Sequence, residues 1–277
     1  MSVGCHNWCS YFKNLKVNGI CSFSSKGYPS LVNTSLIKLL VTSGFLLGCR
    51  VIFKNNKLVV FFPSLLYDAM QYMFIPLNYF LGSVTYLLPT GRSRWSESGF
   101  ENVALDVGAD ELAIVKADIF ADSDVAHREE AYVALYDSLP AVTAETDLVN
   151  RTWNGRILRT NRSLLDLADW LLVRPLGLLG FKWGKRYRSQ HIGDPLLVRW
   201  LDTLYFPLPV WGNVGMIDIR WRGVPTATMN YDYQPWKDYF RLLKSDDGKV
   251  VLLGVWTHKE VAGGWFSLTL DPEVPTN

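Results

Sequence analysis

The segment Met229–Trp256, with the sequence MNYDYQPWKDYFRLLKSDDGKVVLLGVW, decides the fold of this chain. Its first residues end a predicted strand, and a polar corner follows in which Pro235 allows a single helical turn. The turn sequence SDDG at 245–248 then leads into an uncharged strand that begins at Val250. Two strand signals joined by a polar connection predict a compact hairpin unit.

Short β segments recur on both sides of this hairpin and are separated by turns rich in Gly, Pro and Asp. The five strand candidates are Pro195–Trp200, Met216–Trp221, Val224–Tyr231, Val250–Trp256 and Trp265–Leu270. Several alternate in part between apolar and polar residues, and little helix lies between them. This spacing predicts an antiparallel meander that curls into a barrel, and hence a mainly β (α+β) fold with short flanking helices.

Two helices are predicted before these strands. The first begins at Asp122–Asp124, whose side chains are favourable N-caps, and Pro140 ends it. Its apolar residues recur with helical spacing at Tyr132, Leu135, Tyr136 and Leu139. The second begins with a capping box at Ser163, is apolar nearly all round and ends before Pro175, which predicts a buried helix or a lid.

Charge and composition divide the chain near residues 96–101. Residues 1–100 hold nine basic and two acidic side chains, whereas residues 101–277 hold 19 basic and 24 acidic ones. All four cysteines lie in the first part, and nine of the eleven tryptophans lie from Trp153 onward. We therefore predict a separate, basic and poorly defined N-terminal region at residues 1–98. The acidic balance of the β-rich part argues against nucleic acid as a partner.

Residues 36–88 of the N-terminal region are strongly apolar and leave several interpretations open. Leu58–Leu88 is long enough to cross a bilayer, but Gln71, Pro76 and Asn78 disfavour a crossing. The region is membrane-associated, disordered or a wrongly predicted extension. No cleavable signal peptide is evident. We expect a cytoplasmic protein, with membrane contact through residues 36–88 as the alternative.

Motifs for the common metals and cofactors do not occur in the sequence. Cys5, His6 and Cys9 are a fragment of a zinc pattern, and only Cys21 lies near enough to extend it. H-E-x-x-H, Walker, G-x-G-x-x-G and G-x-S-x-G sequences are absent. We therefore predict reduced cysteines, no metal and no cofactor.

Two motifs before the opening segment carry a family resemblance. RTWNG at 151–155 follows a helix that ends in a Leu-Pro turn, and it resembles the G-x-W-x-G signature of the GXWXG protein family, with arginine in place of the first glycine. Trp183–Tyr187 resembles the W-x-G-K-R-[FY] segment of this family, without the spacer residue after the tryptophan. The resemblance implies that Trp153 packs as a plug at the floor of a lipocalin-like barrel.

The opening segment closely resembles the domain of unknown function that follows the GXWXG domain in the same family. The matching residues are Met229, Tyr231, Asp232, Pro235, Asp238, Phe240, Arg241, Asp246, Asp247, Leu253, Gly254 and Val255. The two resemblances imply a lipocalin-like antiparallel β-barrel, with a GXWXG-like domain at 118–225 and a C-terminal domain at 226–277 that completes it. They imply no particular reaction.

The first of two possible functions is the binding of a small hydrophobic molecule, in a metabolic or secondary-metabolite pathway, by an aromatic-rich barrel. The predicted ligand-binding residues are Trp153, Trp183, Arg186, Trp221, Trp256 and Trp265, with Trp211 as a further candidate. Ordinary core packing is the alternative role for the aromatic residues.

The second possible function is catalysis without a cofactor, by an isomerase, cyclase or dehydratase that acts on a hydrophobic intermediate. One carboxylate with a cationic or phenolic partner is sufficient for acid/base chemistry. The predicted catalytic residues are Tyr231, Asp232, Lys185 and His258, with Asp238 and Arg186 as further candidates. A capping role in the polar corner is the alternative for Asp232. The basic cluster at 182–188 is either a solvated strand end or a clamp for an anion. The sequence does not indicate an oligomeric state.

Overall fold

The computed structural model describes residues 50–54, 57–61, 64–87, 105–160, 164–189, 191–208, 210–258, 261–272 and 274. These residues all belong to one compact unit of the chain, residues 39–277. The predictions for the four cysteines and for the apolar residues 36–49 lie outside the described residues.

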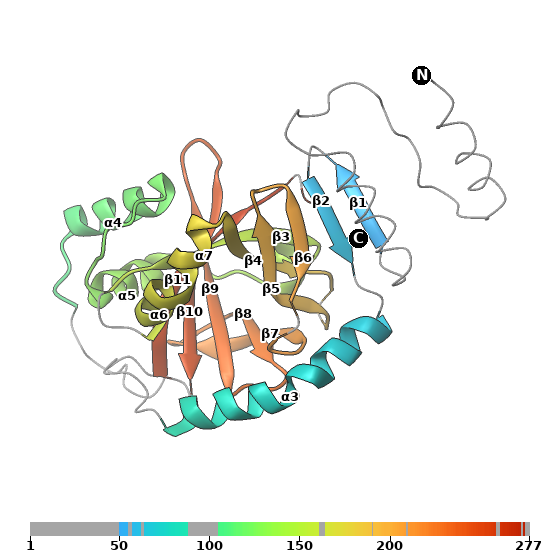
Figure 1. Cartoon of the computed structure of the whole chain (residues 1–277). Helices are drawn as coiled ribbons and strands as arrows, with labels where there is room; N and C mark the ends of the chain where they lie inside the picture. Colours follow the sequence, from blue (N-terminus) through green and yellow to red (C-terminus); the bar gives the residue numbers. More distant parts are fainter. Residues whose placement is uncertain are drawn as a thin grey trace, which may run out of the picture. The chain divides into compact units, whose positions relative to one another are not determined.

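One sheet of eleven strands organises the described part of the chain (Figure 1). Its strands are β1 (Arg50–Lys54), β2 (Lys57–Phe61), β3 (Arg151–Leu158), β4 (Phe181–Tyr187), β5 (Gly193–Trp200), β6 (Leu204–Pro207), β7 (Val214–Trp221), β8 (Val224–Tyr231), β9 (Trp236–Lys244), β10 (Val250–His258) and β11 (Val261–Leu270). Their order across the sheet is β1-β2-β6-β5-β4-β3-β11-β10-β9-β8-β7. Neighbours are antiparallel, except that β2 and β6 pair in parallel. The predicted mainly β fold is therefore confirmed.

Helices flank this sheet. They are α3 (Ser64–Leu87), α4 (Ala109–Ala121), α5 (Glu129–Ser138), the π-helical turn η1 (Ala144–Leu148), α6 (Leu164–Ala168), the π-helical turn η2 (Asp169–Val173) and α7 (Arg174–Leu178). Among the described residues, no helix is both long enough and apolar enough to cross a membrane.

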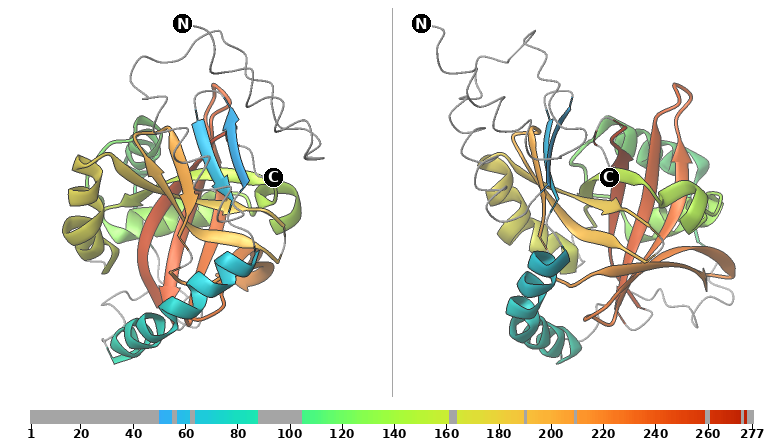
Figure 2. Two further views of the ribbon diagram at one scale, coloured as in Figure 1. Left: turned by 45° about the vertical axis from the view of Figure 1, so that its right-hand side comes forward. Right: turned by 90° about the vertical axis from the view of Figure 1, so that its right-hand side faces the viewer.

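The sheet is strongly curved but not closed (Figure 2). Its two edges are β1 and β7. The loop before β7 approaches the start of β5, where the backbone N–H of Gly193 donates to Asn213 Oδ1 over 3.1 Å. No ladder of hydrogen bonds joins β5 to β7 within the described ranges, so the predicted closed barrel is not confirmed.

The two faces of the sheet carry separate cores. The outer core lies under α4 and α5 and includes Val115, Ile119, Tyr132, Tyr136, Trp221, Tyr239, Leu253 and Trp265. The inner core includes Trp153, Tyr187, Met216, Met229, Tyr231, Trp236, Phe240 and Phe266. The rings of Tyr187 on β4 and Phe240 on β9 are only 6.4 Å apart, although three strands separate β4 from β9. The inner core therefore lies on the concave face.

Strand β9 corrects the prediction of a helical turn after Pro235. Residues 236–244 are extended and pair with both β8 and β10. Successive side chains point to opposite faces of a strand, so Tyr239 enters the outer core while Phe240 enters the inner core. A strand that is buried on both faces lacks the polar–apolar alternation by which strands are predicted.

The first predicted helix begins later than expected. Asp122 is the C-cap of α4, in the left-handed conformation with φ 57°, and α5 begins only at Glu129 after Arg128 as N-cap. Aspartate tolerates this conformation better than most residues, so an Asp-rich stretch ends one helix here instead of starting the next. The predicted apolar face of α5 is confirmed by Tyr132 and Tyr136, which are buried in the outer core.

The second predicted helix is neither buried nor ended by Pro175. The segment α6–η2–α7 continues to Leu178, with Pro175 in the first turn of α7. Proline is tolerated there because first-turn N–H groups have no partner within the helix. Its large apolar side chains are exposed, namely Leu167, Trp170, Leu171, Leu172, Leu176 and Leu178.

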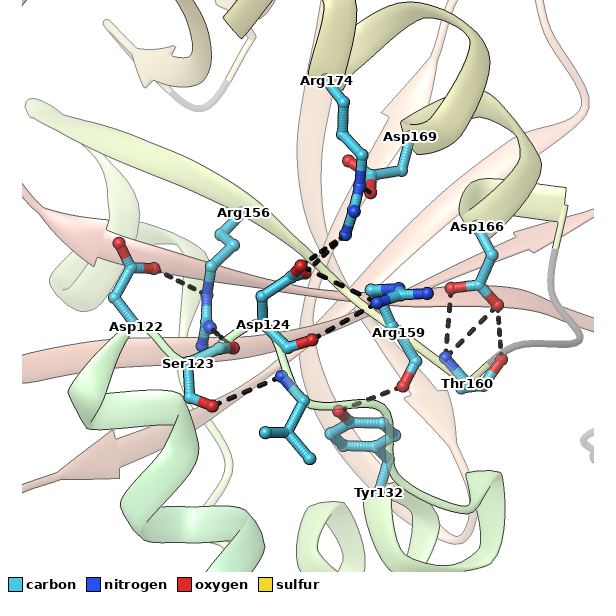
Figure 3. A network of polar contacts seen from close by, with 11 residues as sticks. Asp122, Ser123, Asp124, Tyr132, Arg156, Arg159, Thr160, Asp166, Asp169 and Arg174 are labelled. Atoms are coloured by element: carbon cyan, nitrogen blue, oxygen red, sulfur yellow. Dashed lines mark hydrogen bonds and ion pairs between the residues drawn. The ribbon is translucent and has the colours of Figure 1, made fainter. Parts of the chain in front are cut away.

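A network of polar contacts holds α6–η2–α7 on the sheet (Figure 3). Arg174 lies between Asp169 and Asp124, with Nε–Oδ2 and Nη2–Oδ1 distances of 2.7 and 2.6 Å. The hydroxyl of Thr160, just after β3, donates to Asp166 on α6 over 2.8 Å. Exposed ion pairs of this kind contribute little each to stability, so the network positions the segment more than it stabilises the protein.

Candidate functional site

Three polar side chains meet inside the inner core. The Nζ atom of Lys185 lies 2.8 Å from the hydroxyl of Tyr231 and 3.0 Å from Asp238 Oδ2. The hydroxyl of Tyr231 donates to the same carboxylate oxygen over 2.8 Å. All three residues are buried. A buried ion pair with a shared phenol is unusual enough in an aromatic core to be the candidate site, which we call the Lys–Tyr–Asp cluster.

The register of β8 and β9 brings the hydroxyl of Tyr231 and the carboxylate of Asp238 together. Asp238 on β9 lies directly opposite Met229 on β8, and Tyr231 follows two residues later on the same face of β8. Tyr231 and Asp238 are seven residues apart in the sequence, and the bend at 232–235 brings them side by side in space. The cluster depends on β9 being a strand.

Strand β4 supplies the lysine from the opposite side of the curve, beside a β-bulge in β5. The register between β4 and β5 shifts between Gly184 and Arg186, because two residues of β5, Pro195 and Leu196, lie opposite Lys185 alone. A bulge re-aims side chains and increases local twist. Lys185 Nζ also lies 3.3 Å from the carbonyl oxygen of Pro195, its neighbour across the bulge.

Gly184 allows β4 to approach β3 closely beside Lys185, and replacing it is expected to disrupt the site. A Cβ atom at Gly184 would lie 2.3 Å from the backbone carbonyl oxygen of Trp153, which has no freedom to move aside. We expect Gly184→Ala to lower the free energy of unfolding by about 1–3 kcal/mol. Gly215→Ala on β7 is the matched control, because a Cβ atom there meets nothing within 4 Å. Equal urea midpoints for the two variants would contradict this prediction.

Burial and charge keep the proton on the phenol of Tyr231. Burial raises the pKa of Tyr231 well above its usual value, and the neighbouring carboxylate of Asp238 raises it further. The phenol is therefore protonated at neutral pH and donates to Asp238 Oδ2. The pKa of Tyr187 is raised by the same two causes. The cluster thus offers a carboxylate that accepts, a phenol that donates and an ammonium group between them.

One acceptor of the cluster remains open. Asp238 Oδ2 receives bonds from both Lys185 and Tyr231, whereas the buried Oδ1 has no hydrogen-bond partner among the described residues. Leaving a buried carboxylate oxygen without a donor is costly. The site is thus built to accept one more hydrogen bond than the described residues supply.

Aromatic side chains surround the cluster. The ring of Phe266 lies 5.5 Å from Lys185 Nζ, and the ring of Trp183 lies 6.0 Å from it. Trp211 and Trp236 pack edge-on against Tyr231, with ring centroids 6.4 and 5.8 Å away. Trp183 and Trp211 are only partly buried, so the cluster lies close below the surface.

The structure brings together two of the predicted catalytic residues, Lys185 and Tyr231, and adds Asp238 as their carboxylate. Asp232 does not join them. It lies in the exposed bend after β8, where partial burial of the carboxyl raises its pKa and a hydrogen bond from the Asn213 backbone opposes this shift. This is the capping role that was the alternative for Asp232. His258 is buried at the end of β10, opposite Trp236.

The predicted ligand-binding tryptophans divide between the two faces. Trp153, Trp183 and Trp256 belong to the inner core or pack against it. Trp221 and Trp265 belong to the outer core, where Tyr136 contacts both rings. Their place under α5 separates them from the Lys–Tyr–Asp cluster by the sheet itself.

The basic cluster at 182–188 does not form a single clamp. Arg186 and Arg188 both bind Asp194, with N–O distances of 2.6 and 3.0 Å, and the guanidinium of Arg186 lies over Phe61 of β2. Lys182 forms an exposed pair with Asp202. Side chains of a strand alternate between faces, so Lys185 points to the opposite side of β4 from Lys182 and Arg186.

Three residues beside the cluster were not predicted as site residues: Tyr187, Trp236 and Phe266. Tyr187 falls within the motif at 183–187, and Trp236 directly follows the polar corner, so both had a signal in the sequence. Phe266 had none, because only the pairing of β11 with β10 and β3 places it here.

The fold and the site define a class of protein: a mainly β chain with an open, concave sheet and a buried lysine–tyrosine–aspartate cluster on its concave face. Residues 213–270, which are β7 to β11 with the residue before them, match a family described as "Domain of unknown function (DUF4334)". This match contains the segment Met229–Val255 and confirms that the segment resembles a domain of unknown function. The resemblance of residues 151–155 to the GXWXG family stays a prediction.

One similar solved structure is described as "Crystal structure of protein from Thermomonospora curvata". It is 25% identical in sequence, with a TM-score of 0.45, and the alignment covers 58% of this chain and 99% of that chain. A comparison with curated proteins found no match.

Proposed function

We propose that this protein binds a small, mainly apolar molecule on the concave face of its sheet, and that a donor group of the molecule bonds to Asp238 Oδ1. The observation that carries the proposal is the buried carboxylate oxygen that lacks a partner among the described residues. An apolar site with one or two placed polar groups is the usual design of a small-molecule site.

The surrounding side chains support an apolar ligand. Trp183, Trp211 and Trp256 pack against the inner core but keep part of their surface exposed. Aromatic rings at such a position offer large contact areas at low cost in side-chain entropy. A ligand that enters beside them reaches Asp238 without crossing the sheet. The lipocalin-like character predicted from the resemblance is part of this proposal.

The proposal is tested with N-phenyl-1-naphthylamine, a neutral aromatic probe that carries one N–H donor. We expect saturable quenching of tryptophan fluorescence when the full chain is titrated with it. Asp238→Asn is expected to weaken binding by about tenfold or more, because a hydrogen bond to a charged acceptor is lost. The control is Asp232→Asn, which removes an exposed carboxylate six residues before Asp238. This variant should bind the probe as the wild type does.

The outcomes separate clearly. Binding that is unchanged in a folded Asp238→Asn variant would show that the carboxylate does not anchor the probe, and the proposal would fail. Circular dichroism spectra and urea midpoints of both variants establish that they are folded before the titrations are compared.

A second function, acid/base catalysis without a cofactor, is favoured by the position of Tyr231. Its protonated phenol touches both the ammonium group and the carboxylate, so it is able to give a proton to a substrate while Asp238 takes one. An isomerase, cyclase or dehydratase needs this combination. In producing cells, Asp238→Asn should then accumulate an intermediate that neither the wild type nor Asp232→Asn accumulates. Equal metabolite profiles would leave binding without catalysis.

A further inference from the structure

Helix α3 has its polar and apolar faces reversed. Gln71 and Asn78 are seven residues apart and therefore on one face of the helix, and both are buried, with 8% and 1% of their surface exposed. The side-chain amide of Gln234, in the bend between β8 and β9, donates to the backbone and side-chain oxygens of Asn78 over 3.0 and 3.3 Å. Amide hydrogen bonds thus attach the polar face to the sheet.

The opposite face of α3 is apolar and points away from the protein. Its large side chains are Tyr72, Met73, Leu77 and Phe80, with 69%, 79%, 42% and 63% of their surface exposed. Residues 69–80 contain no charged side chain, and Asp68 marks the N-terminal end of this face. Surface helices of globular proteins bury such a face and expose the polar one. An exposed apolar patch of this kind marks an interaction surface.

We propose that the exposed apolar face of α3, formed by Ala69, Tyr72, Met73, Pro76, Leu77 and Phe80, binds the surface of a lipid bilayer. The absence of charge on the face fits acyl chains and zwitterionic headgroups, and the aromatic rings of Tyr72 and Phe80 suit the boundary between them. The helix lies along the surface, since no described helix is able to cross a membrane.

Pro76 favours a lipid surface over a second copy of the chain. Proline lacks the N–H group that would bond to the carbonyl of Tyr72, and its ring lies on the exposed face. Water at the bilayer interface is able to satisfy that carbonyl, whereas a dry helix–helix contact would bury it without a donor. A proline in the middle of the face also interrupts the regular side-chain ridges that paired helices need.

The experiment is flotation of the full chain with vesicles of phosphatidylcholine. We expect the wild type to float with the vesicles. The partition coefficient of the Met73→Glu/Phe80→Glu variant should be lower by about tenfold or more, because two inserted apolar side chains are lost. Partitioning should stay constant between about 50 and 500 mM salt, since the face carries no charge. Leu178→Glu on α7 is the matched control: this leucine is 90% exposed and lies on a different apolar surface.

Three results would overturn the proposal. The first is a wild type that stays with the soluble fraction. The second is equal flotation of the wild type and the α3 variant, which would place membrane contact elsewhere in the chain. The third is an equal loss in Leu178→Glu, which would show general adhesion of exposed leucines. A homodimer that the α3 variant disrupts, without flotation of the wild type, would assign the face to a second copy.

Discussion

The Lys185→Met variant is expected to lose about 3–5 kcal/mol of unfolding free energy, because it leaves the carboxylate of Asp238 buried without its cation. The partners are 3.0 Å apart, and their side chains are 5% and 1% exposed. Water cannot compensate a charge at this depth. Removing one partner of a buried ion pair is therefore far more costly than the pair itself is stabilising.

Strand β4 contains its own control for this prediction. Lys182→Met breaks a pair with Asp202 of similar length, 2.7 Å, but both side chains are about half exposed. We expect a loss of less than about 1 kcal/mol there, because solvent screens the pair. Urea unfolding of the two variants measures the difference. Similar midpoints would show that the Lys–Tyr–Asp cluster is hydrated and not buried.

A double replacement separates charge from packing. In Lys185→Met/Asp238→Leu both charges are gone and the volume is largely kept, so most of the stability lost in Lys185→Met should return. The double variant should nevertheless bind N-phenyl-1-naphthylamine more weakly than the wild type, because it lacks the carboxylate of Asp238. Recovered stability without recovered binding would assign the cluster to function and not to folding.

The Trp221→Ala variant is expected to lose about 3–5 kcal/mol of unfolding free energy. Trp221 is fully buried in the outer core, stacked on Tyr239 with ring centroids 5.0 Å apart and edge-on to Tyr136 at 5.2 Å. Its removal leaves a cavity under α5 that the rigid sheet cannot close. Probe affinity of the folded variant should stay unchanged, because the sheet separates Trp221 from Asp238.

Trp170→Ala is the matched control for Trp221→Ala. Trp170 is exposed on η2, so its loss should change stability by less than about 0.5 kcal/mol. Thermal or urea unfolding distinguishes the two. If Trp221→Ala lowered probe affinity while leaving stability intact, the division into two cores would be wrong and Trp221 would belong to the ligand site as the sequence suggests.

The sequence predicted the strands whose ends are marked by turn residues and failed where burial removed the pattern. Val224–Tyr231 was predicted with its observed bounds because Gly223 precedes it and a polar bend follows. Strand β9 was missed because it is buried on both faces and its sequence, WKDYFRLLK, does not alternate between polar and apolar residues, and because Pro235 before it suggested a turn. The apolar segment at 163–178 looked buried because composition alone does not show which helix faces water.

The site was only partly predictable for the same reason. Lys185 was visible in the sequence as part of the basic cluster at 182–188, and Tyr231 as part of the polar corner in the opening segment. The preference for Asp232 over Asp238 followed from the error at β9, since Asp238 has no reason to lie beside Tyr231 unless residues 236–244 form a strand. The bulge opposite Lys185 depends on one extra residue in β5, which no local pattern revealed.

The place of β3 in the sheet has a consequence for protein synthesis. β3 pairs with β4 on one side and with β11 on the other, and the side-chain bond from Asn154 to Asp271 spans 117 residues. At about 5–20 residues per second, the ribosome needs roughly 6–23 seconds to translate that interval. During this time the nascent chain presents an open strand edge to which other chains can add. The edge of β3 is covered only when β11 has emerged, so slower translation prolongs its exposure.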